Sequence, residues 1–259
     1  MSAGDLLNTI IIENIFAFLL IFTRIGTAVM LMPGIGDSFI STKIRLFFVL
    51  AISFVMTPIL MPHIPAIPNE TYAFAYLIMT ELFIGIFIGT VMRILLTALD
   101  TAGMMIAMQA GFANAQIFNP VLGGQGSLPG TLLTLLGILI IFATNMHHLL
   151  ITSVFESYNI FPANGEFLDT GSTAEVISRS AMLAYKTGFQ FAIPFFIMGL
   201  IVYLGFGLLG RLMPQIQVFF LALPLQIILG LITLSIVFPA GMLFWLAHYE
   251  SAIINLLNL

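Results

Sequence analysis

Charged residues are scarce in this chain. Lys, Arg, Asp and Glu make up 7 % of its 259 residues, hydrophobic residues make up 60 %, and the mean hydropathy is +1.14. A soluble globular protein carries about 25 % charged residues, because its surface must be hydrated. The composition therefore excludes an ordinary soluble enzyme and a disordered chain. It predicts that most of the surface faces lipid or apolar protein.

Cysteine is absent, which excludes a disulfide framework, a thiolate metal site and a cysteine nucleophile. The net charge is -4 and no basic block is present, so we expect no nucleic-acid partner. His147 and His148 are adjacent, and on a helix their side chains point about 100° apart, which is unsuited to one metal ion. The sequence also lacks a phosphate loop, a nucleotide fingerprint and a nucleophile–base set. We therefore expect no metal ion and no cofactor.

Long apolar runs fill most of the sequence. A bilayer crossing takes about 20 apolar residues, and it must be helical because its backbone bonds have to close within the segment. We therefore predict an all-α integral membrane protein of about six or seven kinked apolar helices and helical hairpins. The apolar runs are 10–32, 46–61, 72–92, 94–118, 132–154, 187–209 and 216–245.

Prolines and charges interrupt these runs. Pro194, Pro224 and Pro239 lie inside apolar runs, where each removes a backbone hydrogen bond. They indicate either ordinary helix kinks or, in the last run, two half-helices that form a hairpin. Residues 155–186 hold six of the 18 charged residues and are predicted to be a short polar loop. We treat residues 1–259 as a single helical subunit.

Small residues predict close helix packing in two places. Gly85 and Gly89 form a GxxxG motif in the run 72–92. A second stripe recurs every four residues on one helix face, and small side chains at this spacing let another backbone approach closely. This stripe is Gly103, Ala107, Gly111 and Ala115.

The segment that follows is unlike the rest of the chain, because it is rich in amides, Gly and Pro but uncharged. Its amides are Gln109, Asn114, Gln116, Asn119 and Gln125. Unpaired amides are costly in hydrocarbon, and irregular backbone at membrane depth must be buried by protein or line a cavity. We therefore predict a re-entrant or pore-lining loop over 109–127, in which Phe112, Ile117 and Phe118 act as apolar closing groups. A plain polar loop between helices is the alternative.

Four ionisable residues lie in or beside apolar runs: Arg24, Glu81, Arg93 and Asp100. Such residues usually face the interior of a helix bundle and form pairs. Arg93 and Asp100 are separated by about 10 Å along a helix, so we expect each to pair with another helix or chain. Glu81 is interpreted either as a structural ion-pair partner or as a proton-relay carboxylate.

Four blocks of the sequence resemble one known family. They are FTRIGTAVMLMPGIGDSFISTKIRLFFVLA (22–51), MQAGFANAQIFNP (108–120), TNMHHLLI (144–151) and RLMPQIQVFFLALPLQIILGL (211–231). The blocks resemble the FliR family of flagellar export-gate proteins and, in injectisomes, the T-family subunits of type III secretion. They keep the order and spacing of the family over about residues 10–250.

The resemblance implies a non-enzymatic subunit of the flagellar type III export gate. It implies FliP-like and FliQ-like partner subunits, an FlhB-like subunit, membrane lipid, and unfolded flagellar proteins as the export substrates. It places the chain in the bacterial inner membrane, in the flagellar basal body. It also implies that much of the apolar surface packs on partner subunits.

The same resemblance implies that the segment beginning at Gln109 plugs the pore. Some members of the family carry an acidic residue at the position of Asn119. A negative charge at this position is therefore not essential to the pattern. Carried over position by position, the plug residues are Gly111, Phe112, Ala113, Asn114, Ile117, Phe118, Asn119 and Pro120.

Two other functions remain open from the residues alone. A proton-coupled secondary transporter would use Glu81, Arg93 and Asp100 as relay or substrate groups, with broken helices near the midplane of the bilayer. A non-conducting membrane scaffold would need no path through the protein.

Overall fold

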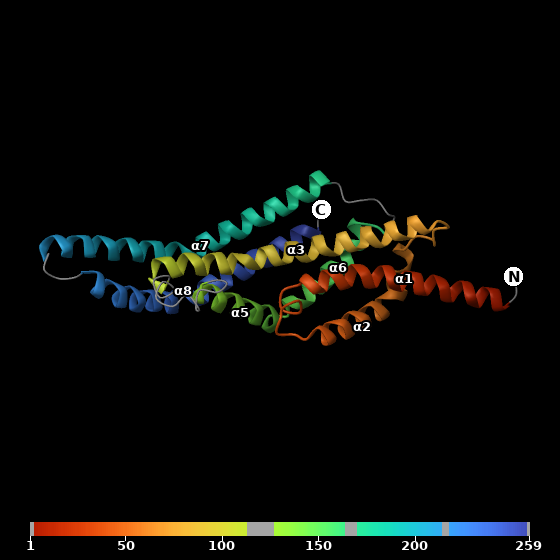
Figure 1. Cartoon of the computed structure of the whole chain (residues 1–259), viewed down its shortest axis with the longest axis horizontal. Helices are drawn as coiled ribbons and strands as arrows, with labels where there is room; N and C mark the ends of the chain where they lie inside the picture. The colour runs from red at the N-terminus through yellow and green to blue at the C-terminus, as the bar shows by residue number, and fades with distance from the viewer. Residues whose placement is uncertain (1–2, 113–126, 164–169, 214–217, 258–259) are drawn as a thin grey trace. The chain divides into compact units, whose positions relative to one another are not determined.

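The structure is a computed structural model that describes residues 3–112, 127–163, 170–213 and 218–257. Within these ranges all regular structure is helical and no strand occurs, which confirms the all-α prediction (Figure 1). The elements are α1 (Ala3–Leu31), α2 (Thr42–Leu60), the 3-10 helix η1 (Met61–His63), α3 (Thr71–Gln109), α5 (Leu128–Ala143), α6 (Met146–Ile160), α7 (Thr170–Leu212) and α8 (Val218–Leu257).

Five of these helices are long and apolar enough to cross a bilayer, or six crossings result if α5 and α6 are counted as one broken span. The most apolar stretches differ in burial. In α3, 61 % of that stretch is buried, against 22 % in α7 and 17 % in α8. Helix α3 is therefore mostly enclosed by its own chain, whereas α7 and α8 present apolar side chains outward.

The runs 72–92 and 94–118 are not separate helices. Helix α3 continues from Thr71 to Gln109. Arg93 does not end the helix, because its guanidinium group forms an ion pair with the Asp37 carboxylate. The expected boundary was wrong because a paired charge is compatible with a continuous helix.

Prolines bend but do not divide the last helices. Pro194 lies inside α7, and Pro224 and Pro239 lie inside α8, which is one element from Val218 to Leu257. Of the two interpretations, ordinary proline positions within a helix match the structure, and a hairpin within α8 does not.

The run 132–154 is not one continuous helix. Helix α5 ends at Ala143, α6 begins at Met146, and Asn145 between them has a φ of 58°. Asn tolerates this left-handed conformation better than most residues. The start of α5 is capped: the Gly130 N–H donates to Ser127 Oγ at 3.0 Å, so Pro129 is accommodated in the first turn.

The polar stretch 155–186 is predicted to be a loop, but both ends of this stretch are helical. Helix α6 continues to Ile160, and α7 begins at Thr170. The charges do not prevent a helix here, because exposed side chains of opposite sign, such as Arg179 and Glu175, pair one turn apart.

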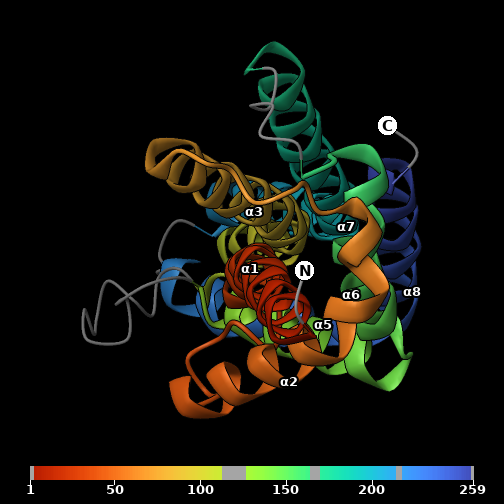
Figure 2. The ribbon, with the colours of Figure 1, turned by 90° about the vertical axis from the view of Figure 1, so that its right-hand side faces the viewer.

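The chain divides into two compact units. Unit 1 comprises Met1–Ile94, Thr144–Ser180 and Ala252–Leu259. In this unit α2 runs beside the C-terminal half of α1, and α1 also contacts α6 (Figures 1 and 2). Its core includes Leu20, Ile21 and Ile88, which are fully buried.

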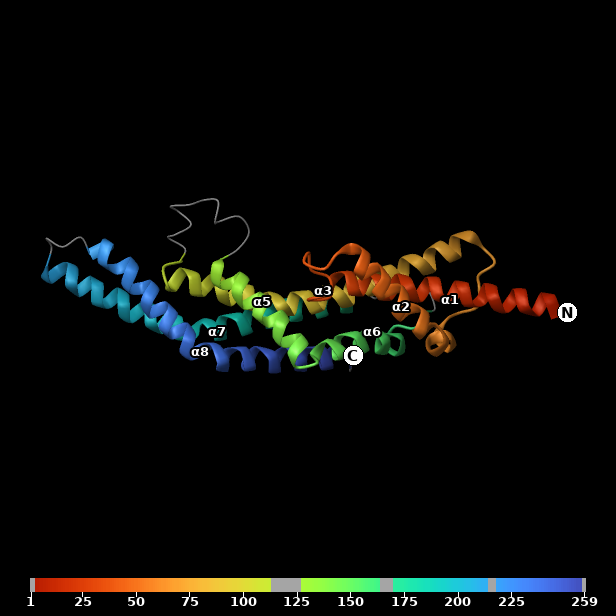
Figure 3. The same ribbon diagram turned by 90° about the horizontal axis from the view of Figure 1, so that it is seen from below.

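Unit 2 comprises Leu95–Ala143 and Ala181–Ser251. Here α7 and α8 run side by side in opposite directions (Figure 3). Gly241 of α8 lies directly against the ring of Phe191 of α7. The buried core of unit 2 includes Leu99, Phe195 and Trp245.

Candidate functional site

The C-terminal end of α3 leads into the predicted plug. The helix ends at Gln109, and Gly111 has a φ of 76°, a backbone conformation that L side chains rarely adopt. Gly111 is buried and Phe112 is half-buried. The remaining predicted plug residues and Ala115 of the small-residue stripe lie outside the described residues: Ala113, Asn114, Ile117, Phe118, Asn119 and Pro120.

Glycines from three other helices hold this end of α3. A Cβ on Gly103 would collide with the backbone of Gly130 at the start of α5. A Cβ on Gly199 of α7 would collide with the Gln109 side chain, and one on Gly230 of α8 would collide with Ala110. At Gly103 and Gly230 the obstructing atoms are backbone atoms or a Cβ, so α5 and α8 approach α3 closely, whereas at Gly199 the obstruction is the movable end of the Gln109 side chain. The end of α3 is therefore packed against three other helices.

Other members of the two small-residue motifs are also buried. Ala107 lies on the buried side of α3. In unit 1, a Cβ on Gly85 would collide with Thr27 and with the Arg24 carbonyl of α1, and one on Gly89 would lie 2.7 Å from Leu31 Cβ. The GxxxG motif of α3 is thus the surface on which α1 packs.

A buried ion pair joins the same two helices. Arg24 of α1 and Glu81 of α3 are both fully buried. Arg24 Nε donates to Glu81 Oε2 at 2.6 Å, and its Nη2 donates to Oε1 at 2.9 Å. This two-pronged geometry neutralises both charges inside a low-dielectric interior.

Helix α6 completes the environment of this arginine. Arg24 Nη1 donates to Ser157 Oγ at 3.3 Å, and Nη2 donates to the Phe161 carbonyl at 2.9 Å. The guanidinium carbon lies 3.8 Å from the centroid of the Tyr158 ring, as in a cation–π contact. Arg24 therefore ties α1, α3 and α6 together.

Arg93 belongs to a different, half-buried cluster. Its Nη2 donates to Asp37 Oδ1 at 2.7 Å, and Asp37 Oδ2 accepts the Gly34 N–H at 2.8 Å. This pairing fixes the turn between α1 and α2, where Gly34 has a φ of 85°. Asp100 forms no ion pair with the part of the chain that the structure describes, and its carboxylate lies beside Gly130.

Several of these contacts were not predicted from the sequence. Asp37 and the α6 residues around Arg24 carry no spacing signal, because their partners lie far away along the chain. Gly130 is a packing position in α5 that lies outside both small-residue motifs marked by the sequence. The glycines of α7 and α8 lie in apolar runs without a GxxxG spacing to mark them.

Comparison with known proteins places the chain in a family. The family described as bacterial export proteins, family 1, matches residues 15–252. The chain belongs to this family. The match spans most of both units, including the ion pairs Arg24–Glu81 and Arg93–Asp37 and the end of α3.

Three similar proteins each match most of the length of this chain. The flagellar biosynthetic protein FliR of Caulobacter vibrioides is 35 % identical over 92 % of this chain and 94 % of its own length. The FliR protein of Bacillus subtilis is 27 % identical over 87 % of each chain. The secretion system apparatus protein SsaT of Salmonella typhimurium is 28 % identical over 73 % of each chain.

The described residues of this family member contain no cluster of three or more metal-ligating His, Cys, Asp or Glu side chains. Its buried charges are neutralised by each other, and glycine positions allow helices to approach closely both at the end of α3 and between α1 and α3. This arrangement can hold a segment in a fixed place.

Proposed function

We propose that this chain is a pore-forming subunit of the bacterial flagellar type III export gate, in which the segment after α3 closes the path of unfolded flagellar proteins. It would act in the inner membrane, at the flagellar basal body, with FliP-like, FliQ-like and FlhB-like subunits. Membership of an export family and near full-length similarity to FliR proteins support the flagellar assignment.

The proposal for the plug rests on the packing at the end of α3. The amide-rich segment follows a helix that three other helices approach at glycine positions. A closing element needs such a base, because a plug on a mobile support would admit ions. Phe112, the first aromatic residue after the turn at Gly111, would exclude water from the constriction.

Deletion of 110–119 tests the plug directly. We expect the gate, reconstituted with its partner subunits in a planar bilayer, to conduct ions at rest, whereas the intact gate is closed. Motility on soft agar and co-purification of the subunits establish that the variant is produced and assembled. If the assembled deletion variant conducts no more than the intact gate, the plug assignment is wrong.

A point variant sharpens this test. Phe112→Ala should raise the resting conductance, whereas Phe112→Leu, which keeps an apolar side chain, should leave it low. Equal conductance of the two variants would contradict closure by an apolar group at this position.

The transporter alternative predicts another outcome. Both carboxylate oxygens of Glu81 accept hydrogen bonds from Arg24, so the carboxylate is engaged in a structural pair. In an export-gate subunit, Glu81→Gln should reduce secretion only to the extent that it reduces assembly. A fully assembled variant that loses proton-coupled uptake of a solute would favour the transporter.

A further inference from the structure

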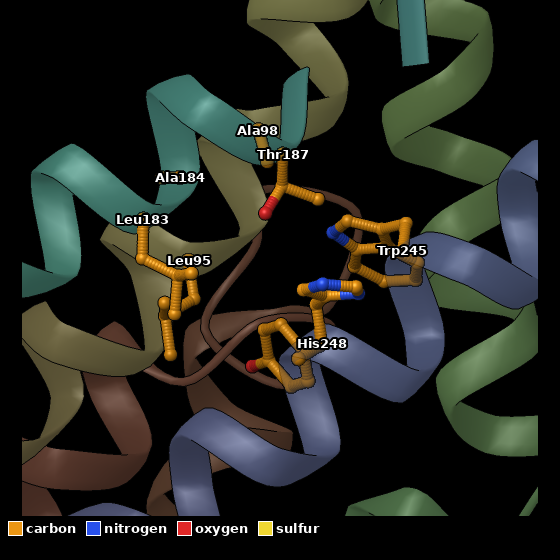
Figure 4. A pocket seen from close by; sticks show the side chains of 8 residues that line it. Leu95, Ala98, Leu183, Ala184, Thr187, Trp245 and His248 are labelled. Atoms are coloured by element: carbon orange, nitrogen blue, oxygen red, sulfur yellow. The ribbon is translucent and has the colours of Figure 1, made fainter. Parts of the chain in front are cut away.

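A small cavity of about 10 Å³ lies within unit 2, between α3, α7 and α8. Its lining includes Thr187 of α7 and Trp245 and His248 of α8, whose side chains gather around one space in Figure 4. A space of this size holds about one water molecule and nothing larger.

Two buried polar atoms at this cavity lack hydrogen-bond partners among the described residues: Trp245 Nε1 and Thr187 Oγ1. The Trp245 and Thr187 residues are only 1 % and 3 % exposed. The indole N–H can only donate, and a buried donor without an acceptor is costly. The helices that carry both residues are apolar enough to span a bilayer, where lipid offers no acceptor.

Thr187 differs from four other helical threonines of this chain. Thr23, Thr27, Thr57 and Thr233 each donate to the carbonyl group four residues earlier. That bond satisfies a hydroxyl group without any tertiary partner. Thr187 does not form it, so its hydroxyl group is available to the cavity.

His248 supplies a third polar group. Its Nδ1 lies 2.9 Å from the Phe244 carbonyl oxygen. A carbonyl oxygen only accepts, so in the neutral ring Nδ1 carries the proton and Nε2 is an acceptor. The lining thus combines a donor, a hydroxyl group and an acceptor, and two to four such partners are what a buried water requires.

We propose that this cavity binds one structural water molecule that links α7 to α8. The water accepts the Trp245 N–H, hydrogen-bonds to Thr187 Oγ1 and donates to His248 Nε2. The site is separate from the end of α3, because its lining residues on that helix, Leu95 and Ala98, lie at least 11 residues before Gln109. It gives the α7–α8 pair a polar connection.

The test uses the full chain in lipid nanodiscs, with ¹⁵N in the indole ring of its one tryptophan. Solid-state NMR measures magnetisation transfer from water to the indole N–H, and Trp245→Phe assigns the signal by removing it. We expect rapid transfer from a bound water in the wild-type chain. Absence of transfer in the wild-type chain would overturn the proposal.

Matched variants separate the water site from general access of solvent. Thr187→Val keeps the shape of the side chain but removes the hydroxyl group, and it should abolish the transfer. Thr187→Ser should retain it. Thr233→Val is the control, because Thr233 already donates to the Leu229 carbonyl, and it should have no effect. Undiminished transfer in a folded Thr187→Val chain would show that Thr187 does not hold the water.

Discussion

Arg24 and Glu81 are costly to separate, because each would leave the other as an uncompensated charge in a buried environment. We expect Arg24→Ala and Glu81→Ala each to destabilise the chain by about 3–5 kcal/mol. The double variant Arg24→Met with Glu81→Leu should be less destabilised than either single variant, since it removes both charges and fills the space. Unfolding midpoints in detergent, converted to free energies, measure this difference.

The exposed pair Arg179–Glu175 is the control for these variants. Its side chains are largely exposed, so Arg179→Ala should change the free energy of unfolding by less than about 1 kcal/mol. If Arg24→Ala were as mild as Arg179→Ala, the buried pair would not stabilise the contact among α1, α3 and α6.

Gly111 is the second position where one residue decides the local backbone. Its φ of 76° is left-handed, and a side chain there costs about 1–2 kcal/mol. Gly111→Ala should lower the unfolding free energy by about that amount, and Gly111→Asn should cost less, because Asn tolerates this conformation.

Substitution of Gly207 should have the opposite effect on stability from substitution of Gly111. It lies within α7, and a Cβ there meets nothing within 4 Å. Gly207→Ala should be neutral or stabilising, since Ala favours a helix over Gly. A similar loss of stability in both variants would indicate that the backbone at Gly111 is not the cause.

At the scale of elements, α3 depends on the close approach of α5. Gly103→Val would force its side chain into the backbone of Gly130, which cannot rotate away as a side chain can. We expect a loss of about 1–3 kcal/mol of stability from this overpacking. Secretion should fall with it, because the base of the segment after Gln109 shifts. The unfolding midpoint and the amount of exported flagellin measure the two effects.

Gly205→Val is the matched control within α7. No heavy atom lies within 4 Å of a Cβ at Gly205, so a side chain there meets no packing neighbour in the chain. The Gly205→Val chain should retain stability close to that of the wild type. Normal stability and export in the Gly103→Val chain would contradict the proposed role of the α3–α5 contact.

The sequence predicts the existence of the helices well, because long uncharged apolar runs leave few alternatives in a membrane protein. It does not predict where a helix ends when a charged residue within that helix forms an ion pair. Arg93 suggested a boundary, but the pairing with Asp37, 56 residues earlier, lets α3 continue. A single sequence contains no trace of such a distant pairing, and the same applies to the Gly103–Gly130 contact. The predicted plug residues beyond Phe112 lie outside the described residues and stay a prediction.

At the scale of the whole molecule, α7 and α8 present large apolar side chains that the described part of the chain leaves uncovered. Ile236 of α8 is 73 % exposed. In a gate subunit, this surface should contact other membrane proteins. We expect a photo-crosslinking amino acid at position 236 to form protein adducts in cells that produce the other gate subunits. Gel mobility and mass spectrometry identify the adducts.

The same probe at position 179 is the control, because that part of α7 is charged and exposed. It should form few adducts with membrane subunits. Adducts with lipid alone at position 236 would show that this face of α8 borders the bilayer.

The length of α3 has a consequence for how the protein is made. Its 39 residues rise about 58 Å along the helix axis at 1.5 Å per residue, nearly twice the hydrocarbon thickness of about 30 Å. Synthesis therefore delivers an apolar helix that the bilayer alone cannot shelter along its whole length. The newly made chain is stable only when other apolar protein covers the excess. In the proposed gate, partner subunits would supply that cover, so subunit made in surplus over its partners would be a target for proteolysis.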